Sequence, residues 1–513
     1  MNLKLPNVMI HKVLVANRGE IAIRVMRSCR EMNIRSVAVF SEADRKSLHV
    51  RYADEAYCIG PAPSAESYLN MDKIIEVALE TGVDAIHPGY GFLSENAEFA
   101  RKCIEAGIIF IGPSPEAIAL MGDKITARKT MIAAGVPVVP GTTNKITTED
   151  EALKIVDEIG LPVMIKASAG GGGKGMRLVH QKEDVKSALG MARSEALSAF
   201  GDDSVYIEKY IESPHHIEFQ IFGDQLGNVV HLFERECSVQ RRHQKVVEET
   251  PSPNITPEIR AEMGAYAVRA AKAVGYYGAG TIEFIMDDES HYYFLEMNTR
   301  LQVEHPITER VVGIDLVKLQ IKIAEGLALP FQQDGLRQFG HAIECRIYAE
   351  DPYQNFIPSP GKILHISEPL GLGIRHDGYV YSGYEIPIEY DPLISKLIVW
   401  GQSRQEAITR MRRALLAYKI TGITTSIPFL KRIMESPVFI KGNYNTHFIE
   451  NNLPFLLSTD SCDEICEDVA IMAAYIHYLD QLKAQSNHIA NKTASSPWKD
   501  FGRIVSIKGA NIY

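Results

Sequence analysis

One short segment of the chain combines residue types that could bind a metal ion and perform acid–base chemistry. Residues 296–306 (Glu-Met-Asn-Thr-Arg-Leu-Gln-Val-Glu-His-Pro) alternate polar and apolar side chains, as a strand with one buried face does. A second alternating run lies at residues 281–286, and residues 287–290 between them have the composition of a turn. The pattern predicts a β-hairpin.

This hairpin would place two carboxylates opposite each other. With Glu289 and Ser290 at its tip, Glu283 pairs directly with Glu296, and Asn298 follows on the same face. Facing carboxylates destabilise a sheet by repulsion, but a divalent cation turns them into a site, because Mg²⁺ and Mn²⁺ prefer carboxylate and amide oxygens. The alternative is a solvated hairpin face whose charges are paired with water.

Three further polar residues continue the alternation. Arg300 offers a fixed positive charge, Gln302 an amide, and Glu304 a carboxylate that could act as a general base. Since residues two apart in an extended chain share a face, all three should lie on the side of Asn298. Functional groups gathered this densely on one face favour a reactive site over a solvated surface.

A glycine-rich segment upstream has the composition of a lid. We predict a strand at residues 161–167 carrying Lys166, five glycines and Lys174 at residues 170–175, and another strand at residues 176–180. No helix follows, so this is not a dinucleotide-binding loop, and the lysine is followed by glycine, so it is not a Walker loop. Because glycines in a fixed loop cost about 1 kcal/mol each in entropy, a mobile lid over phosphates is favoured over a functionless loop.

Strands alternating with helices organise the start of the chain. Strands at residues 13–17, 36–40, 85–87 and 108–111 predict a parallel α/β sheet. In a later α+β unit, Arg346 lies between apolar neighbours of a predicted strand, so it is either ion-paired or active. The predicted domains are residues 1–121 (parallel α/β), 122–325 (with the lid at about 138–211), 340–450 (α+β) and 451–513 (a C-terminal extension).

Three segments have two interpretations each. Residues 87–96 form a glycine-punctuated loop at the carboxyl end of a strand, where open sheets bind ligands, but a tight turn with a capping serine explains them equally. Residues 240–245 are rich in basic side chains, which indicates a solvated surface or an anion pocket. The backbone of the strand at 205–211 could bind an adenine edge, although any edge strand could look the same.

Composition limits the class of protein. The 513 residues, 46% hydrophobic and 23% charged, are typical of a globular protein of roughly three to four domains. A net charge of −10 argues against nucleic-acid binding. No apolar run approaches the roughly 18 residues of a membrane span, and no signal-peptide core is present, so we expect a cytoplasmic protein without a membrane partner. The seven cysteines form no CxxC pair, which favours reduced thiols over a zinc site.

Together these segments resemble the biotin carboxylase component of biotin-dependent carboxylases, a family of ATP-grasp fold. The resemblance covers residues 10 to about 450 and implies a Rossmann-like N-terminal domain, an ATP-grasp domain with a mobile lid, and a C-terminal α+β domain. Lys174 stands where arginine is common in the family, a change that we expect to be harmless. The motifs that carry the resemblance are residues 16–22, 87–96, 166–173, 240–245 and 296–306.

The resemblance also implies roles for individual residues. ATP would be bound by Lys124, Lys166, Gly172, Gly173, Glu208, Lys209, Tyr210, Ile211, His216, Gln240, His243, Glu283 and Glu296. Mg²⁺ or Mn²⁺ would be held by Glu283, Glu296 and Asn298, and bicarbonate by Lys245, Arg300, Gln302 and Val303. The implied catalytic residues are Lys245, Arg300, Glu304 and Arg346, with Glu304 deprotonating bicarbonate and Arg346 binding biotin and stabilising its enolate.

The implied reaction starts with attack of bicarbonate on the γ-phosphoryl group of ATP, which gives carboxyphosphate. Water must be excluded from this species, which breaks down to CO₂ and phosphate. The phosphate can then take the proton from the ureido nitrogen of biotin. A route through Cys237 and Lys245 as the base is less favoured, because it requires a thiol whose pKa is lowered.

The chain contains no Ala-Met-Lys-Met-like biotinyl segment and no region of carboxyltransferase size. We therefore expect biotin on a separate carrier protein, a separate carboxyltransferase subunit, and acetyl-CoA, propionyl-CoA or pyruvate as final acceptor. A homodimer is expected, with Arg27 and Glu31 either at the interface or forming a surface i,i+4 pair. Residues beyond 455 would dock a carboxyltransferase or carrier subunit, with disordered decoration as the alternative.

Two other functions remain open on the sequence. One is a different ATP-grasp ligase that makes an acylphosphate, such as a carbamoyl-phosphate or purine-pathway enzyme. The other is a non-catalytic regulatory subunit that binds nucleotide. The set Arg300, Gln302 and Glu304 together with Arg346 favours the biotin assignment over the first, and the intact catalytic-type positions disfavour the second.

Overall fold

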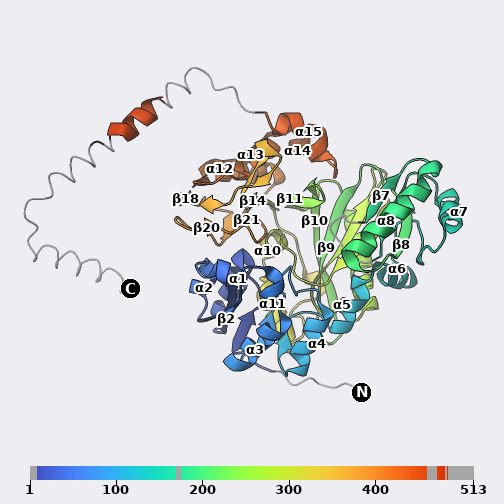
Figure 1. Cartoon of the computed structure of the whole chain (residues 1–513), viewed down its shortest axis with the longest axis horizontal. Helices are drawn as coiled ribbons and strands as arrows, with labels where there is room; N and C mark the ends of the chain where they lie inside the picture. The colour runs from blue at the N-terminus through green and yellow to red at the C-terminus, as the bar shows by residue number, and fades with distance from the viewer. Residues whose placement is uncertain (1–7, 169–174, 459–470, 480–481, 483–513) are drawn as a thin grey trace, which may run out of the picture. The chain divides into compact units, whose positions relative to one another are not determined.

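The computed structural model describes residues 8–168, 175–458, 471–479 and 482. Its contacts divide the chain into two units, Met1–Leu457 and Ser458–Tyr513. The first unit contains all the sheets of the described chain, and Figure 1 colours its elements in chain order.

The first unit begins with a five-stranded parallel sheet, as predicted. Its order is β3-β2-β1-β4-β5, and its inner strands are buried on both faces, which explains their nearly continuous apolar sequence. Strand β3 was not expected from the sequence, because its residues are mostly half-buried and lack that pattern. The elements are β1 (Lys12–Val15), α1 (Gly19–Glu31), β2 (Arg35–Ser41), α2 (Leu48–Tyr52), β3 (Glu55–Gly60), α3 (Met71–Thr81), β4 (Ala85–His87), α4 (Ala97–Glu105), β5 (Ile109–Phe110) and α5 (Pro115–Gly122).

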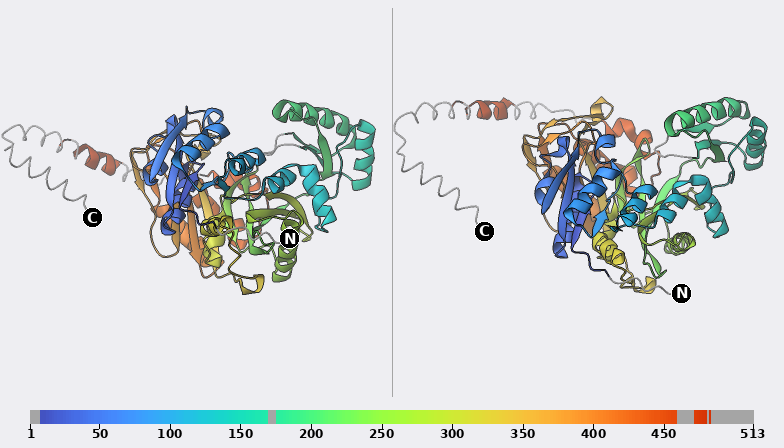
Figure 2. Two further views of the ribbon diagram at one scale, coloured as in Figure 1. Left: turned by 90° about the horizontal axis from the view of Figure 1, so that it is seen from below. Right: turned by 60° about the horizontal axis from the view of Figure 1, so that its bottom comes forward.

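A smaller sheet with its own apolar core forms the predicted lid region. Its order is β7-β6-β8, with both pairs antiparallel, and it appears with α7 and α8 as a separate green lobe in Figure 2. Gly172, Gly173 and Lys174 lie outside the described residues. The elements are α6 (Lys124–Ala133), α7 (Glu149–Ile159), β6 (Val163–Ala167), β7 (Met176–Val179), α8 (Val185–Phe200) and β8 (Val205–Lys209).

The largest sheet has eight antiparallel strands in the order β13-β12-β9-β10-β11-β14-β21-β19. It crosses the predicted boundary between residues 325 and 340, because β11 pairs with β14. One continuous sheet therefore carries side chains from both predicted domains. Its strands are β9 (His215–Gly223), β10 (Val229–Arg241), β11 (Gln244–Thr250), β12 (Gly278–Met286), β13 (Tyr292–Asn298), β14 (His341–Tyr348), β19 (Ile374–Gly378) and β21 (Leu393–Gly401).

Helices cover both faces of this sheet around β14. Ile343, Cys345 and Ile347 face an apolar core shared with α12 and α13, while Glu344 and Arg346 alternate to the opposite face, which α10 covers. The helices are α9 (Pro257–Ala273), α10 (His305–Val312), α11 (Leu316–Ala324), α12 (Arg404–Ala417), α13 (Ile427–Glu435), α14 (Pro437–Lys441) and α15 (Phe448–Leu456). The short strands are β15 (Glu350–Asp351), β16 (Ile357–Pro358), β17 (Gly361–Lys362), β18 (His365–Ser367), β20 (Glu385–Ile386) and β22 (Lys419–Thr421).

The predicted hairpin is formed by β12 and β13, but its turn differs from the prediction. Met286 pairs with Tyr292, and the Asp287 carboxylate accepts hydrogen bonds from the amides of Glu289 and His291. This local capping favours a wider turn than the predicted tip at Glu289 and Ser290. A β-bulge then shifts the register by one residue between Glu283 and Phe284, so that Glu283 does pair with Glu296.

The sequence of residues 470–482 predicts a helix in the second unit, and the structure has a helix at residues 471–479. Its large apolar side chains are exposed. Residues 502–507 have a sequence that could pair as a strand, but they lie outside the described residues. Across the part of the chain that the structure covers, no helix is both long and apolar enough to span a membrane.

Candidate active site

A cavity of about 230 Å³ lies where β6 and β8 of the small sheet approach β9 and β10. Apolar side chains such as Met164, Met176 and Leu295 supply part of its wall, which suits a flat base. Lys124 and Glu296 line an adjoining recess that also includes Glu208. Eight of the residues predicted to bind ATP line the main cavity: Lys166, Glu208, Lys209, Tyr210, Ile211, His216, Gln240 and His243.

The facing carboxylates Glu283 and Glu296 lie next to this cavity. Asn298 donates from Nδ2 to Glu283 Oε1 at 2.8 Å, and His216 Nε2 lies 2.9 Å from Glu283 Oε2. Burial and the charge of Glu283 raise the pKa of Glu296. One buried and one half-buried carboxylate and an amide, with one carboxyl pushed toward its neutral form by the other, fit a Mg²⁺ or Mn²⁺ site.

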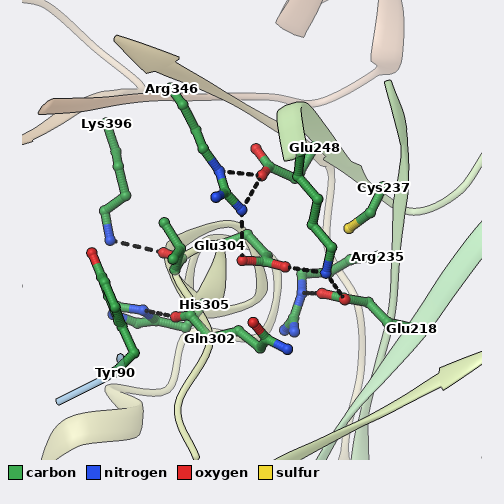
Figure 3. A network of polar contacts seen from close by, with 12 residues as sticks. Tyr90, Glu218, Arg235, Cys237, Glu248, Gln302, Glu304, His305, Arg346 and Lys396 are labelled. Carbon is green, nitrogen blue, oxygen red and sulfur yellow. Dashed lines mark hydrogen bonds and ion pairs between the residues drawn. The ribbon is translucent and has the colours of Figure 1, made fainter. Parts of the chain in front are cut away.

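A network of buried charges continues from Glu283 toward the strand that carries Arg346. Lys245 Nζ lies 3.1 Å from Glu283 Oε1 and 2.7 Å from Glu304 Oε1, and it also donates to Glu218. Arg346 donates from Nε to Glu248 Oε1 at 2.6 Å and from Nη2 to Glu304 Oε2 at 3.0 Å. Figure 3 shows Arg346 between Glu248 and Glu304. Glu304 therefore lies between two cations.

These cations decide the ionisation of Glu304. Burial alone would raise the pKa of Glu304, but the charges of Lys245 and Arg346 outweigh burial and hold it well below its usual range. Burial likewise opposes the charge on Lys245, but the carboxylates of Glu218 and Glu283 raise its pKa well above the ordinary value. Glu304 is thus an ionised carboxylate fixed beside two positive charges.

Arg300 links the hairpin to the N-terminal sheet unit. It donates to Glu95 Oε2 at 2.8 Å, Gln302 Oε1 at 3.0 Å and Asn298 Oδ1 at 3.2 Å. Gln302 in turn donates to Glu283 Oε1 at 3.3 Å. Strand β13 ends at Asn298 and Glu304 directly precedes helix α10, so the predicted strand alternation does not continue to Glu304. Side-chain contacts of Arg300 and Gln302 with Asn298 and Glu283 nevertheless bring these polar groups together.

A second cavity, of about 470 Å³, opens beside Arg300, Val303 and Arg346. Its opposite wall includes Tyr90 from the loop at residues 87–96. Asn17 holds this loop by donating from Nδ2 to the carbonyls of Pro88 and Tyr90, at 2.7 and 2.8 Å. The loop therefore lines the site, and the residue that caps the helix after it is Asn96, not a serine.

Comparison with known proteins decides between the ATP-grasp alternatives. Family models match residues 9–118 ("Biotin carboxylase, N-terminal domain"), 123–332 ("Carbamoyl-phosphate synthase L chain, ATP binding domain") and 344–451 ("Biotin carboxylase C-terminal domain"). The middle match is to an ATP-binding domain named for another enzyme, but both flanking matches are specific. The chain belongs to the biotin carboxylase family.

Individual biotin carboxylases and related proteins support this membership. A pyruvate carboxylase subunit from Methanothermobacter thermautotrophicus is 58% identical over 86% of this chain and 90% of its own length. Biotin carboxylase 1 of Bacillus subtilis is 55% identical over 86% of this chain and 98% of its own length. The biotin carboxylase domain dimer of Hydrogenobacter thermophilus 2-oxoglutarate carboxylase, solved with MgADP, ADP and bicarbonate, has a TM-score of 0.85 at 50% identity, covering 88% of this chain and all of that one.

Cys237 lacks the properties that a base in this biotin carboxylase site would need. Its side chain is fully buried. Burial and the carboxylates of Glu218 and Glu304 raise the pKa of the Cys237 thiol well above its ordinary value, although Lys245 opposes them. The thiol is therefore protonated, which agrees with the lower ranking given to the cysteine route.

The structure bears on two local interpretations from the sequence. Arg27 and Glu31 do not form an i,i+4 pair, because Arg27 lies 3.5 Å from Asp377 and Glu31 pairs with Lys318. Competition from these partners on other elements explains the difference. The basic cluster is divided: Gln240, Arg242 and His243 line the first cavity, Arg241 pairs with Glu350, and Lys245 lies in the buried network.

Four buried residues of this biotin carboxylase site were given no role from the sequence: Glu218, Arg235, Glu248 and Lys396. Arg235 donates to Glu218 at 2.5 Å and orients it toward Lys245. Glu248 anchors Arg346, and Lys396 donates to the main-chain oxygen of Val303. The available signal was a charged residue inside a largely apolar strand segment, as in residues 394–398.

Proposed function

We propose that the residues of this site together carry out the ATP-dependent carboxylation of biotin with bicarbonate, which is the reaction of the biotin carboxylase family. The main support is the position of Glu304, whose carboxylate lies between Lys245 and Arg346 and beside the cavity that Val303 lines. A base flanked by two cations is suited to receive a small oxyanion.

Nucleotide binding falls to the first cavity and its recess. Lys124 and Lys166 contact the phosphates, the backbone and side chains of residues 208–211 contact the adenine, and His216, Gln240 and His243 contact the ribose and phosphate side. Mg²⁺ or Mn²⁺ bound by Glu283, Glu296 and Asn298 would neutralise charge on the triphosphate.

Bicarbonate binds beside the network of buried charges. Lys245 and Arg300 supply the charge, Gln302 an amide, and Val303 its main-chain N–H, since a valine side chain offers no donor. When bicarbonate binds beside Lys245, its negative charge offsets part of the positive charge that lowers the pKa of Glu304. That pKa therefore rises, and the carboxylate becomes a stronger base. The deprotonated bicarbonate attacks the γ-phosphoryl group, giving carboxyphosphate.

Biotin enters the second cavity. Carboxyphosphate breaks down to CO₂ and phosphate, and the phosphate removes the ureido proton of biotin. Arg346, which Glu248 holds in place, offers a fixed positive charge where the enolate oxygen develops. The aromatic wall that includes Tyr90 and Tyr348 suits the apolar part of the vitamin.

The protein acts as one component of a larger assembly. Biotin is presented by a separate carrier protein, and a carboxyltransferase subunit passes the carboxyl group to acetyl-CoA, propionyl-CoA or pyruvate. The exposed apolar side chains of the helix at 471–479 support docking of the C-terminal extension on a carboxyltransferase or carrier subunit. The dimer in the name of one similar structure supports a homodimer.

A steady-state assay tests the central proposal. Phosphate release from ATP should require bicarbonate and increase with free biotin, and Glu304→Gln should reduce this turnover by about 10²–10⁴-fold while nucleotide affinity, measured by titration with ADP, stays within a few fold. The exposed Glu289→Gln serves as the control. Turnover that is indifferent to bicarbonate, or a fully active Glu304→Gln enzyme, would refute the proposal.

A further inference from the structure

Lys396 is a buried lysine for which the proposed mechanism has no role. It lies within β21, its side chain has 0% exposed surface, and its cross-strand partner on β14 is Arg346. Two positive charges directly opposite each other on a ladder repel, and a buried charge is unfavourable unless it is well paired. Stability of the sheet does not account for a lysine here.

The ammonium of Lys396 joins three segments of the site. Nζ donates to the main-chain oxygen of Val303 at 2.8 Å and lies 3.1 Å from Glu20 Oε1 at the start of α1. The same Glu20 oxygen accepts a hydrogen bond from the Tyr90 hydroxyl. Nζ also lies 5.7 Å from the centre of the Tyr90 ring, within cation–π range. Figure 3 shows Lys396 between Arg346 and Tyr90.

The contact with Val303 fixes a peptide plane. A peptide unit is planar and trans, so holding its carbonyl also fixes the direction of its N–H and of the next Cα. Lys396 holds the carbonyl of Val303 and thereby orients the backbone from which the Glu304 side chain projects. His305 holds the preceding plane, because its Nδ1 donates to the carbonyl of Gln302 at 2.8 Å.

Two consecutive peptide units are thus held through their carbonyls by Lys396 and His305. The N–H of Val303 points opposite to the carbonyl of Gln302 and is left available to an anion. Burial and the charges of Lys396, Arg24 and Arg375 lower the pKa of His305 well below its usual value. A neutral ring with its proton on Nδ1 is the form that donates to Gln302.

We propose that Lys396 is a positioning residue for bicarbonate: by holding the Val303 carbonyl it fixes the backbone between Val303 and Glu304, and so aims the Glu304 carboxylate at an anion bound to the Val303 N–H. This inference rests on the proposed function. Lys396 does not line the nucleotide cavity. Its loss should therefore act on the use of bicarbonate and leave the use of ATP unchanged.

The test compares Lys396→Met, which keeps the length of the side chain without its charge, with Lys396→Arg and with the exposed control Lys419→Met. For each enzyme, KM and kcat are measured separately with bicarbonate and with ATP as the varied substrate, and ADP affinity is measured by titration. We expect Lys396→Met to raise the bicarbonate KM at least tenfold and to lower kcat. The KM for ATP and the ADP affinity should change less than twofold, and Lys396→Arg should recover part of the loss.

Tyr90→Phe is a milder second variant, which tests the inference if Lys396→Met does not fold. It removes the hydroxyl that shares Glu20 with Lys396, and we expect a smaller rise in the bicarbonate KM with an unchanged ATP KM. A wild-type enzyme without bicarbonate-dependent turnover would refute the proposed function itself. If the wild type is active but the folded variants have an unchanged bicarbonate KM, or equal rises in both KM values, the role of Lys396 alone is overturned.

Discussion

Glu283 and Glu296 are Cα partners on β12 and β13, brought opposite each other by a β-bulge one residue away. Their carboxylates respond in opposite directions to the shared surroundings. Burial alone would raise the pKa of Glu283, but Lys245 and His216 outweigh it and lower that pKa, while burial and the Glu283 charge raise the pKa of Glu296. Two ionised carboxylates directly opposite each other repel, and a bound metal cation would offset this repulsion.

Removal of one carboxylate should therefore weaken the binding of the metal ion. In Glu296→Gln we expect the Mg²⁺ concentration for half-maximal ATP turnover to rise at least tenfold, which corresponds to about 1.4 kcal/mol. The measurement is a Mg²⁺ titration after treatment with a chelator, which should abolish wild-type turnover. Glu289→Gln, in the exposed turn of the same hairpin, is the control, and equal Mg²⁺ dependence in both variants would contradict the metal site.

Arg346 should affect biotin more than bicarbonate. Arg346→Ala removes the fixed charge beside the second cavity, and we expect biotin-stimulated turnover to fall by about 10²–10³-fold. Turnover without biotin should fall less, because Lys245 still holds Glu304. Phosphate release is measured with and without free biotin, with the exposed Arg337→Ala as control. Equal losses in the two assays would argue against a biotin role.

The ionised Glu249 side chain is predicted to make the stability of the fold depend on pH in acid. Burial alone would raise its pKa, but the hydrogen bond to His341 and the pairing with Arg404 lower it to about 2 from an ordinary 4.5. Because the folded-state pKa is the lower one, this contribution, about 3 kcal/mol, is present above pH 4.5 and is lost as the pH falls toward 2.

Urea unfolding at several pH values tests this linkage. Glu249→Gln should be less stable than wild type by about 3 kcal/mol at pH 7, and the difference should shrink as the pH falls below 4.5. Glu385→Gln, which removes an exposed carboxylate, is the control. A difference that is constant from pH 7 to pH 3 would mean that the Glu249 charge does not contribute.

The C-terminal extension should be needed for assembly and dispensable for chemistry. A chain ending at Leu457 retains the whole first unit, so we expect carboxylation of free biotin within twofold of wild type and loss of co-elution with the carboxyltransferase or carrier subunit. Ile476→Asp on the exposed apolar helix should give the same loss, and Ala474→Asp, on the opposite side of that helix, should not. Unchanged co-elution of the truncated chain would show that docking lies elsewhere.

Much of this protein could be predicted from local sequence patterns. Alternation placed Glu283, Glu296 and Asn298 on one face, and apolar runs indicated the parallel sheet, because strand periodicity is encoded by neighbouring residues. The wide turn and the bulge of the hairpin were missed, since side-chain capping by Asp287 and the irregular register add no clear signal to the sequence.

By itself, the sequence determined the residue types of the site, the pairing of Glu283 with Glu296 and the family. The family resemblance grouped Lys245 and Arg346, but only the tertiary structure decided that Lys396 of β21 lies beside Arg346 of β14, because adjacent pairing of β11, β14 and β21 joins segments from both sides of a predicted domain boundary. It also decided which charges are ionised, since burial and the distance to an opposite charge, both set by packing, control the pKa of a buried group.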